Sequence, residues 1–106
     1  MKIVFDQGTT APLRGALAAH EVTTAYEMGW GELENGALLD AVTGAFDVFI
    51  TTDQSLPFQQ NLKGRTFAVL VLPTTSWPRL QSHLGQIAAA VEELRPGLTL
   101  ALQFHD

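Results

Sequence analysis

The sequence predicts an α/β fold, a three-layer α/β/α sandwich around a mostly parallel sheet of four or five strands. Short apolar segments alternate with segments of helical spacing along the 106 residues, a pattern typical of parallel sheets covered by helices. The segments 3–5, 48–50 and 67–71 are apolar without interruption, as expected of central strands buried on both faces. The length suits one domain, so we expect residues 1–106 to form a single domain.

The first half of the chain predicts three strands and two helices. Strands are expected where β-branched and aromatic residues concentrate, at 2–6, 20–25 and 46–53. A short helix follows the first strand and is weakened by Gly15. A second helix is expected to begin with Asn35 as its N-cap and to run to about Gly44.

The second half predicts two further strands and one long helix. A poor helix at 56–61, broken by Pro57, precedes the strand at 66–72. A helix over 77–94 follows, with Thr75 or Ser76 as its cap, and a last strand covers 98–102. The long helix has an apolar stripe at alternating spacings of three and four, which we assign to the core, with a homodimer seam as the alternative.

Composition limits the function classes. The chain has no cysteine and no apolar run near the ~20 residues of a membrane helix. Because a strand is predicted directly after Met1, we expect no secretory signal. We therefore expect a soluble cytoplasmic protein without a membrane partner. The formal net charge of −5 argues weakly against non-specific binding to nucleic acid, but it does not exclude a metal-dependent nuclease.

Two acids follow predicted strands: Asp6 ends the first and Asp53 ends the third. Ligands of open α/β sheets bind beyond the carboxyl ends of the strands, so this pair could hold Mg²⁺ or Mn²⁺. We expect the two carboxylates to lie within about 8 Å of each other and mutual repulsion to raise the pKa of both. The alternative is that Asp6 caps the turn at 7–8 and Asp53 caps the next helix.

Four segments carry a resemblance to a known family. They are the first strand with Asp6, the segment 35–39, the strand end 51–53, and the segment 56–62 with its sequence Leu-Pro-Phe-Gln-Gln-Asn-Leu. Together they resemble the small PIN-like family DUF5615. The resemblance implies a PIN-like sandwich and a Mg²⁺- or Mn²⁺-dependent endoribonuclease, with Asp6 and Asp53 as catalytic and metal-binding acids. It also implies RNA as a partner, and many PIN domains are toxins with a cognate antitoxin protein.

The chain departs from the family pattern at two places. Relatives usually carry a glutamate where this chain has Ala37, and many carry another acid in the segment where this chain has Gln54, Ser55 and Leu56. Asp40 or Glu34 could supply a missing carboxylate, although a solvated surface role is the alternative for both. We therefore expect weak binding of Mn²⁺ and slow or absent cleavage, and we expect Ala37→Glu to tighten Mn²⁺ binding.

Other residues are candidates for contacting the substrate. Arg14, Lys63 and Arg65 could meet phosphate, while Gln59 and Asn61 could contact phosphate or a base. The alternative for these amides, as for the intervening Gln60, is to bond the backbone at the end of a broken helix. Two functions remain open: a metal-dependent endoribonuclease, or a non-catalytic PIN-like module that binds a protein or RNA.

Overall fold

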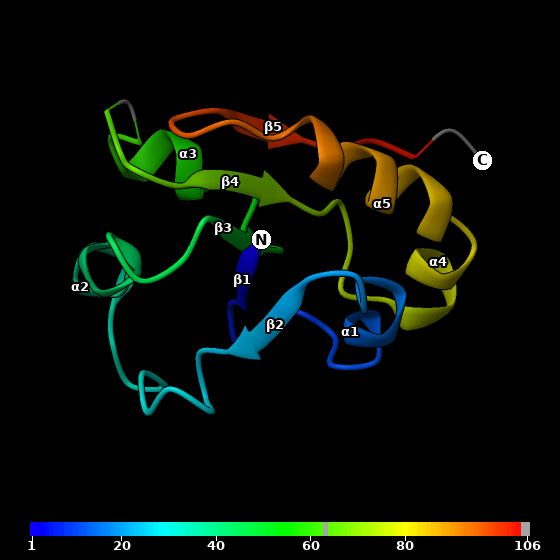
Figure 1. Ribbon diagram of the computed structural model, residues 1–106, viewed down its shortest axis with the longest axis horizontal. Coiled ribbons are helices and arrows are strands. Elements are labelled where there is room, and N and C mark those ends of the chain that lie inside the picture. The colour runs from blue at the N-terminus through cyan, green and yellow to red at the C-terminus, as the bar shows by residue number, and fades with distance from the viewer. Residues whose placement is uncertain (63, 105–106) are drawn as a thin grey trace.

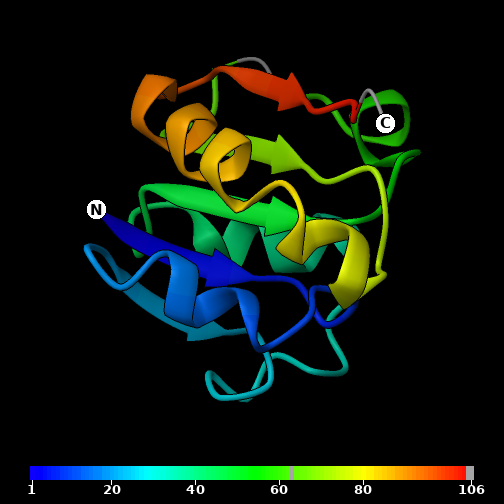
Figure 2. The same ribbon diagram turned by 90° about the vertical axis from the view of Figure 1, so that its right-hand side faces the viewer.

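A computed structural model describes residues 1–62 and 64–104. Its five strands form one sheet in the order β2-β1-β3-β4-β5, and every neighbouring pair is parallel. Figure 2 shows the strand arrows running in one direction with helices in front of them. The strands are β1 (Lys2–Phe5), β2 (Glu21–Thr24), β3 (Val48–Thr51), β4 (Ala68–Val71) and β5 (Thr99–Ala101). The helices are α1 (Leu13–Ala16), α2 (Asn35–Val42), α3 (Leu56–Gln59), α4 (Trp77–Gln81) and α5 (Leu84–Glu93).

Helices cover both faces of this sheet, as the sandwich prediction requires. Figure 1 shows α1, α4 and α5 on one side of the strands, with α2 and α3 on the other. Successive side chains of a strand point to opposite faces. Accordingly, Val48 and Ile50 of β3 belong to the core under α1, α4 and α5, whereas Phe49 belongs to the core under α2 and α3. The expected three-layer α/β sandwich is confirmed.

The three central strands are those whose apolar runs predicted burial on both faces. The cores of β1, β3 and β4, at 3–5, 48–50 and 67–71, are almost completely inaccessible to solvent. The edge strands β2 and β5 are more polar and partly exposed. An uninterrupted apolar strand is stable in water only when neighbours lie on both of its faces and along both of its edges.

Two local predictions are wrong. The helix expected over 77–94 is divided into α4 and α5, since the chain leaves helical geometry at His83 (φ −128°, ψ 24°). The Ser82 hydroxyl donates to the Pro78 carbonyl, a bond that competes with the helix ladder, and the His83 ring stacks on Phe104 with centroids 4.0 Å apart. Asn35 is the first residue of α2 and not its N-cap, which is Glu34.

The direction in which successive strands are added to the sheet reverses at β1. The chain passes from β1 through α1 to β2 on one side, and then through α2 to β3 on the other side of β1. The two crossover helices lie on opposite faces of the sheet (Figure 1). In doubly wound sheets of this order, ligands bind at the carboxyl ends of β1 and β3, where the direction reverses.

No helix in the described residues is both long and apolar enough to cross a membrane.

Candidate functional site

Asp6 stands directly after β1 and is held at the reversal point by three hydrogen bonds. Its backbone N–H donates to the Ile50 carbonyl at 2.9 Å. Its carboxylate Oδ2 accepts from the Thr51 hydroxyl at 2.8 Å, and Oδ1 accepts from the backbone N–H of Gln7, also at 2.8 Å. The side chain therefore stabilises its own turn, as the structural alternative proposed, and also reaches β3.

Asp53 is held by the turn that follows it. Its Oδ1 accepts from the backbone N–H of Ser55 at 2.9 Å and from the Ser55 hydroxyl at 2.6 Å. The side chain of Asn35, at the start of α2, hydrogen-bonds to the same carboxylate. Ser55, not Asp53, immediately precedes α3, so Asp53 forms an Asx turn instead of capping that helix.

These contacts determine the charge of Asp53. The Ser55 hydroxyl lowers the pKa of Asp53, and the Ser55 N–H and the Asn35 amide act in the same direction against a smaller effect of burial. The expected rise in the pKa of Asp53 is therefore wrong, because hydrogen-bond donors surround this acid more closely than a second carboxylate does. Asp53 is ionised at neutral pH.

Thr51, the last residue of β3, connects the two acids. Its hydroxyl donates to Asp6 Oδ2 at 2.8 Å and accepts from the backbone N–H of Asp53 at 3.0 Å. Thr51 is fully buried. The carboxylate of Asp6 and the backbone of Asp53 thus meet on the two sides of one oxygen. Sequence reasoning missed Thr51 because a threonine inside an apolar strand is ordinary for β structure.

An open cleft of about 570 Å³ lies on the β2 side of Asp6. Such a volume is within the range of small-ligand sites. Among the described residues, neither Asp53 nor any lysine or arginine lines this cleft. Its lining residues are Asp6, Gln7, Thr9, Ala11, Thr24 and Tyr26.

Asp40 and Ala37 lie outside the acidic site. In α2, Asn35, Leu38 and Leu39 share the face turned to the sheet, whereas Ala37 and Asp40 are exposed. Asp40 pairs with Arg65, with Nη1 to Oδ1 at 2.8 Å. Within the described ranges, no three acids or histidines are grouped so that they could hold a metal. The set Asp6, Asp53 and Asp40 therefore does not form one ligand group.

The arginines expected to meet phosphate are engaged by acids. Arg65 pairs with Asp40, and Arg14 of α1 pairs with Glu27 in the loop after β2. Arg14 lowers the pKa of Glu27, so the pair is charged at neutral pH. The charge of each arginine is thus already offset by a carboxylate, which weakens the case for either as a phosphate ligand.

The remaining predicted substrate residues lie around α3 or outside the described residues. Gln59 ends α3 with an exposed side chain, and Asn61 follows in the next turn. Neither lines the cleft beside Asp6, although Gln60 lines a shallow hollow of about 390 Å³ with Glu34, Asn35 and Gly36. Lys63 lies outside the described residues.

Comparisons of the chain with models of protein families, with curated proteins and with solved structures found no match.

The site has the chemistry of a single weak cation site. Mg²⁺ binds through one or two carboxylates and keeps several of its waters, and each carboxylate offers about four lone-pair positions. Asp6 uses two of these positions for Thr51 and Gln7. The Asp53 carboxylate uses more of these positions, because it accepts hydrogen bonds from Ser55 and Asn35. The donor set therefore fits one largely hydrated ion and does not supply the carboxylates of a two-metal centre.

Proposed function

We propose that this protein is a PIN-like, Mg²⁺- or Mn²⁺-dependent endoribonuclease with a reduced acidic site, which binds its cation weakly and cuts RNA slowly. One observation carries the proposal: the Thr51 hydroxyl bonds both the carboxylate of Asp6 and the backbone N–H of Asp53, at the point where the strand order reverses. This is the position at which open α/β sheets bind ligands. The resemblance to DUF5615 implies the same two acids as ligands of the cation.

Each residue has a part in this mechanism. Asp6 and Asp53 would hold the cation, and Thr51 fixes the orientation of the Asp6 carboxylate. The lowered pKa of Asp53 keeps that ligand ionised at neutral pH. A bound cation supplies an acidic water and stabilises the charge that develops on the phosphate oxygens.

Calorimetric titration with Mn²⁺ tests the cation site. We expect weak binding by the natural protein, and tenfold or greater loss in both Asp6→Asn and Asp53→Asn. Asp40→Asn is the matched control, because this acid is paired with Arg65 outside the site. If both site variants bind Mn²⁺ as the natural protein does, no shared cation site exists and the nuclease proposal is wrong.

Cleavage is tested on a fluorescent single-stranded RNA with Mn²⁺, with Mg²⁺ and with a chelator. We expect slow internal cleavage that requires the cation and is lost in Asp53→Asn. A toxin of a toxin–antitoxin pair, which the resemblance also implies, would in addition slow the growth of a bacterial host on induction. The double variant Asp6→Asn with Asp53→Asn should relieve that effect.

The second candidate is a non-catalytic PIN-like module that binds a protein or RNA. Two observations favour it: Arg14 is paired with Glu27 and Arg65 with Asp40, and none of the described residues that line the cleft is basic. RNA that binds equally well with and without Mn²⁺, and that stays intact during prolonged incubation, would favour this module over the nuclease.

A further inference from the structure

Tyr26 occupies an unusual position for an aromatic residue. It lies two residues beyond β2, at the carboxyl edge of the sheet, and it lines the cleft beside Asp6. Its side chain is 80% exposed. A large ring left in water at the mouth of a cleft is a candidate for contact with a ligand.

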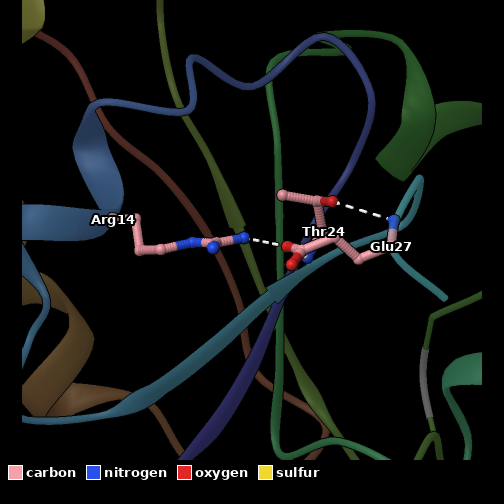
Figure 3. A network of polar contacts seen from close by, with 3 residues as sticks. All are labelled: Arg14, Thr24 and Glu27. Carbon is pink, nitrogen blue, oxygen red and sulfur yellow. Dashed lines mark hydrogen bonds and ion pairs between the residues drawn. The ribbon is translucent and has the colours of Figure 1, made fainter.

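The turn that carries Tyr26 is fixed by a capping box. The Thr24 hydroxyl accepts from the backbone N–H of Glu27 at 3.0 Å, and Glu27 Oε1 accepts from the backbone N–H of Thr24 at 3.1 Å. Arg14 of α1 then donates to the same Glu27 oxygen, as Figure 3 shows. The turn is thereby attached to the neighbouring helix.

A second group of contacts fixes the rest of the loop. The Trp30 ring packs edge-on against Phe46, with centroids 5.8 Å apart, and its backbone N–H donates to the Ala25 carbonyl at 2.9 Å. The Gln7 side chain donates to the Gly31 carbonyl. The loop is therefore held at both ends while the Tyr26 ring between them stays exposed.

We propose that Tyr26 is a stacking platform for a nucleobase, and that Arg14, Glu27 and Thr24 are positioning residues that hold its turn at the cleft. The proposal rests on the proposed function and names the part of the RNA that enters this cleft. The lining residues in the described part of the chain are neutral except for the acid Asp6, so a neutral planar group fits the cleft better than a phosphate does. Because the turn that carries the ring is already ordered, little backbone entropy is lost when a base stacks on it.

The experiment uses adenosine as a neutral probe, with ribose as the comparison. Tyr26 is the only tyrosine of the chain, so a protein labelled with ¹³C-tyrosine gives one set of ring signals. We expect adenosine to shift these signals in a saturable manner and ribose to leave them unchanged. Because no divalent cation is added, this result does not depend on the cation site.

Variants then separate stacking from general effects. The adenosine protons should show saturable binding with the natural protein and with Tyr26→Phe, which keeps the ring. Tyr26→Ala should weaken this binding about fivefold or more, the range for loss of one stacking contact. Phe58→Ala is the matched control, because Phe58 is 91% exposed and lies outside the cleft; we expect no change.

The role of Glu27 in positioning the turn that carries Tyr26 is tested separately. Glu27→Gln keeps an acceptor but loses the charge that pairs with Arg14, so we expect weaker adenosine binding and a Tyr26 signal that moves toward that of a mobile tyrosine. Absence of adenosine binding, or equal binding by Tyr26→Ala and the natural protein, would overturn the proposal. Asp53 does not line the cleft, so Asp53→Asn should bind adenosine as the natural protein does even when its Mn²⁺ binding is lost.

Discussion

At the scale of single residues, one buried hydroxyl organises the candidate site. Thr51 donates to the carboxylate of Asp6 and accepts from the backbone of Asp53. Neither acid is held by the other, and each has further partners in its own turn. The geometry between the acids is therefore set by a residue that carries no charge.

Thr51→Val should disturb the site while it keeps the volume of the side chain. We expect a loss of about 1–3 kcal/mol in the free energy of unfolding, because two hydrogen bonds are removed and a buried N–H loses its acceptor. Thr51→Ser, which retains the hydroxyl, should restore the Mn²⁺ affinity that Thr51→Val loses. Urea unfolding and calorimetry measure the two quantities. Unchanged Mn²⁺ affinity in Thr51→Val would show that Thr51 does not orient Asp6.

Ser55→Ala should raise the pKa of Asp53 toward its ordinary value, because the Ser55 hydroxyl is the main cause of the lowered pKa. A depressed folded-state pKa stabilises the fold above the unfolded-state pKa of about 3.9 and ceases to do so as the pH falls through the folded-state pKa. The stability difference between natural protein and variant should therefore be constant at neutral pH and should shrink in acid. Carboxyl NMR titration and unfolding at several pH values measure both effects.

Asn35→Asp should place a third carboxylate at the site, because the Asn35 side chain already bonds Asp53. We expect tighter Mn²⁺ binding and a raised pKa of Asp53, since a donor is replaced by a like charge. Ala37→Glu is the matched control and should leave Mn²⁺ affinity unchanged, because Ala37 is exposed beside Asp40 on the outer face of α2. This replaces the earlier expectation for Ala37. Tighter binding in Ala37→Glu alone would contradict the placement.

At the scale of secondary-structure elements, the helices are short, and α2 and α4 end at the hydroxyl side chains of Thr43 and Ser82, which bond the helix backbone. The division between α4 and α5 follows from Ser82 and from the stacking of His83 on Phe104. In α5, Gly85 stands near the start of the helix with open space where a Cβ would lie. This glycine therefore weakens the helix without serving a close contact.

Gly85→Ala should stabilise the protein by about 0.5–1 kcal/mol, the difference between glycine and alanine within a helix. Gly8→Ala is the opposite case, because its Cβ would come within 2.8 Å of the Thr52 hydroxyl oxygen, and we expect that variant to be less stable. Urea unfolding of the two variants beside the natural protein checks both signs. A stabilising Gly8→Ala would show that the Thr52 side chain moves at little cost.

Sequence could predict the elements whose signals are local. The strands β1, β3 and β4 were predicted as central because their apolar runs require cover on both faces. The helix break at His83 was not predicted, because the apolar spacing continues through it. Phe104, on which the His83 ring stacks, lies more than twenty residues away. In the site, parallel strand ends predicted that Asp6 and Asp53 share an edge. The pairs Arg14–Glu27 and Arg65–Asp40 depend on how distant surfaces meet, which no local pattern encodes.

One local signal in the site went unused. Thr24 and Glu27 have the spacing of a capping box, and the structure shows both of its hydrogen bonds. That spacing could have indicated an ordered turn after β2. It could not have shown that Tyr26, between them, faces a cleft.

At the scale of the whole molecule, charge is distributed unevenly along the chain. Residues 15–62 contain seven acidic residues and no lysine or arginine. Two of these acids, Glu27 and Asp40, are paired with arginines from outside the segment. A nucleic acid that approaches this half of the protein meets negative charge, and contact depends on cations or on uncharged groups.

Binding of single-stranded RNA should therefore depend only slightly on salt. The logarithm of the affinity falls with the logarithm of the salt concentration by about 0.7 for each phosphate contact. We expect a slope smaller in magnitude than about 1.4, which corresponds to two phosphates or fewer. Fluorescence anisotropy at constant Mn²⁺ and increasing NaCl measures the slope. A steep slope would reveal a basic surface that binds phosphate.

The central place of β1 has a consequence for how the chain folds during synthesis. Of the five strands of this sheet, β1 is synthesised before the others, and its partner across the reversal point, β3, pairs Ile3 with Val48. At about 5–20 residues per second, the ribosome needs a few seconds to make the chain between them. Until β3 is synthesised, the edge of β1 that will pair with it has no partner strand, and its backbone N–H and C=O groups are open to pairing with other nascent chains. Synthesis of β3 fills this edge and leaves the outer edge of β3 to be paired by β4.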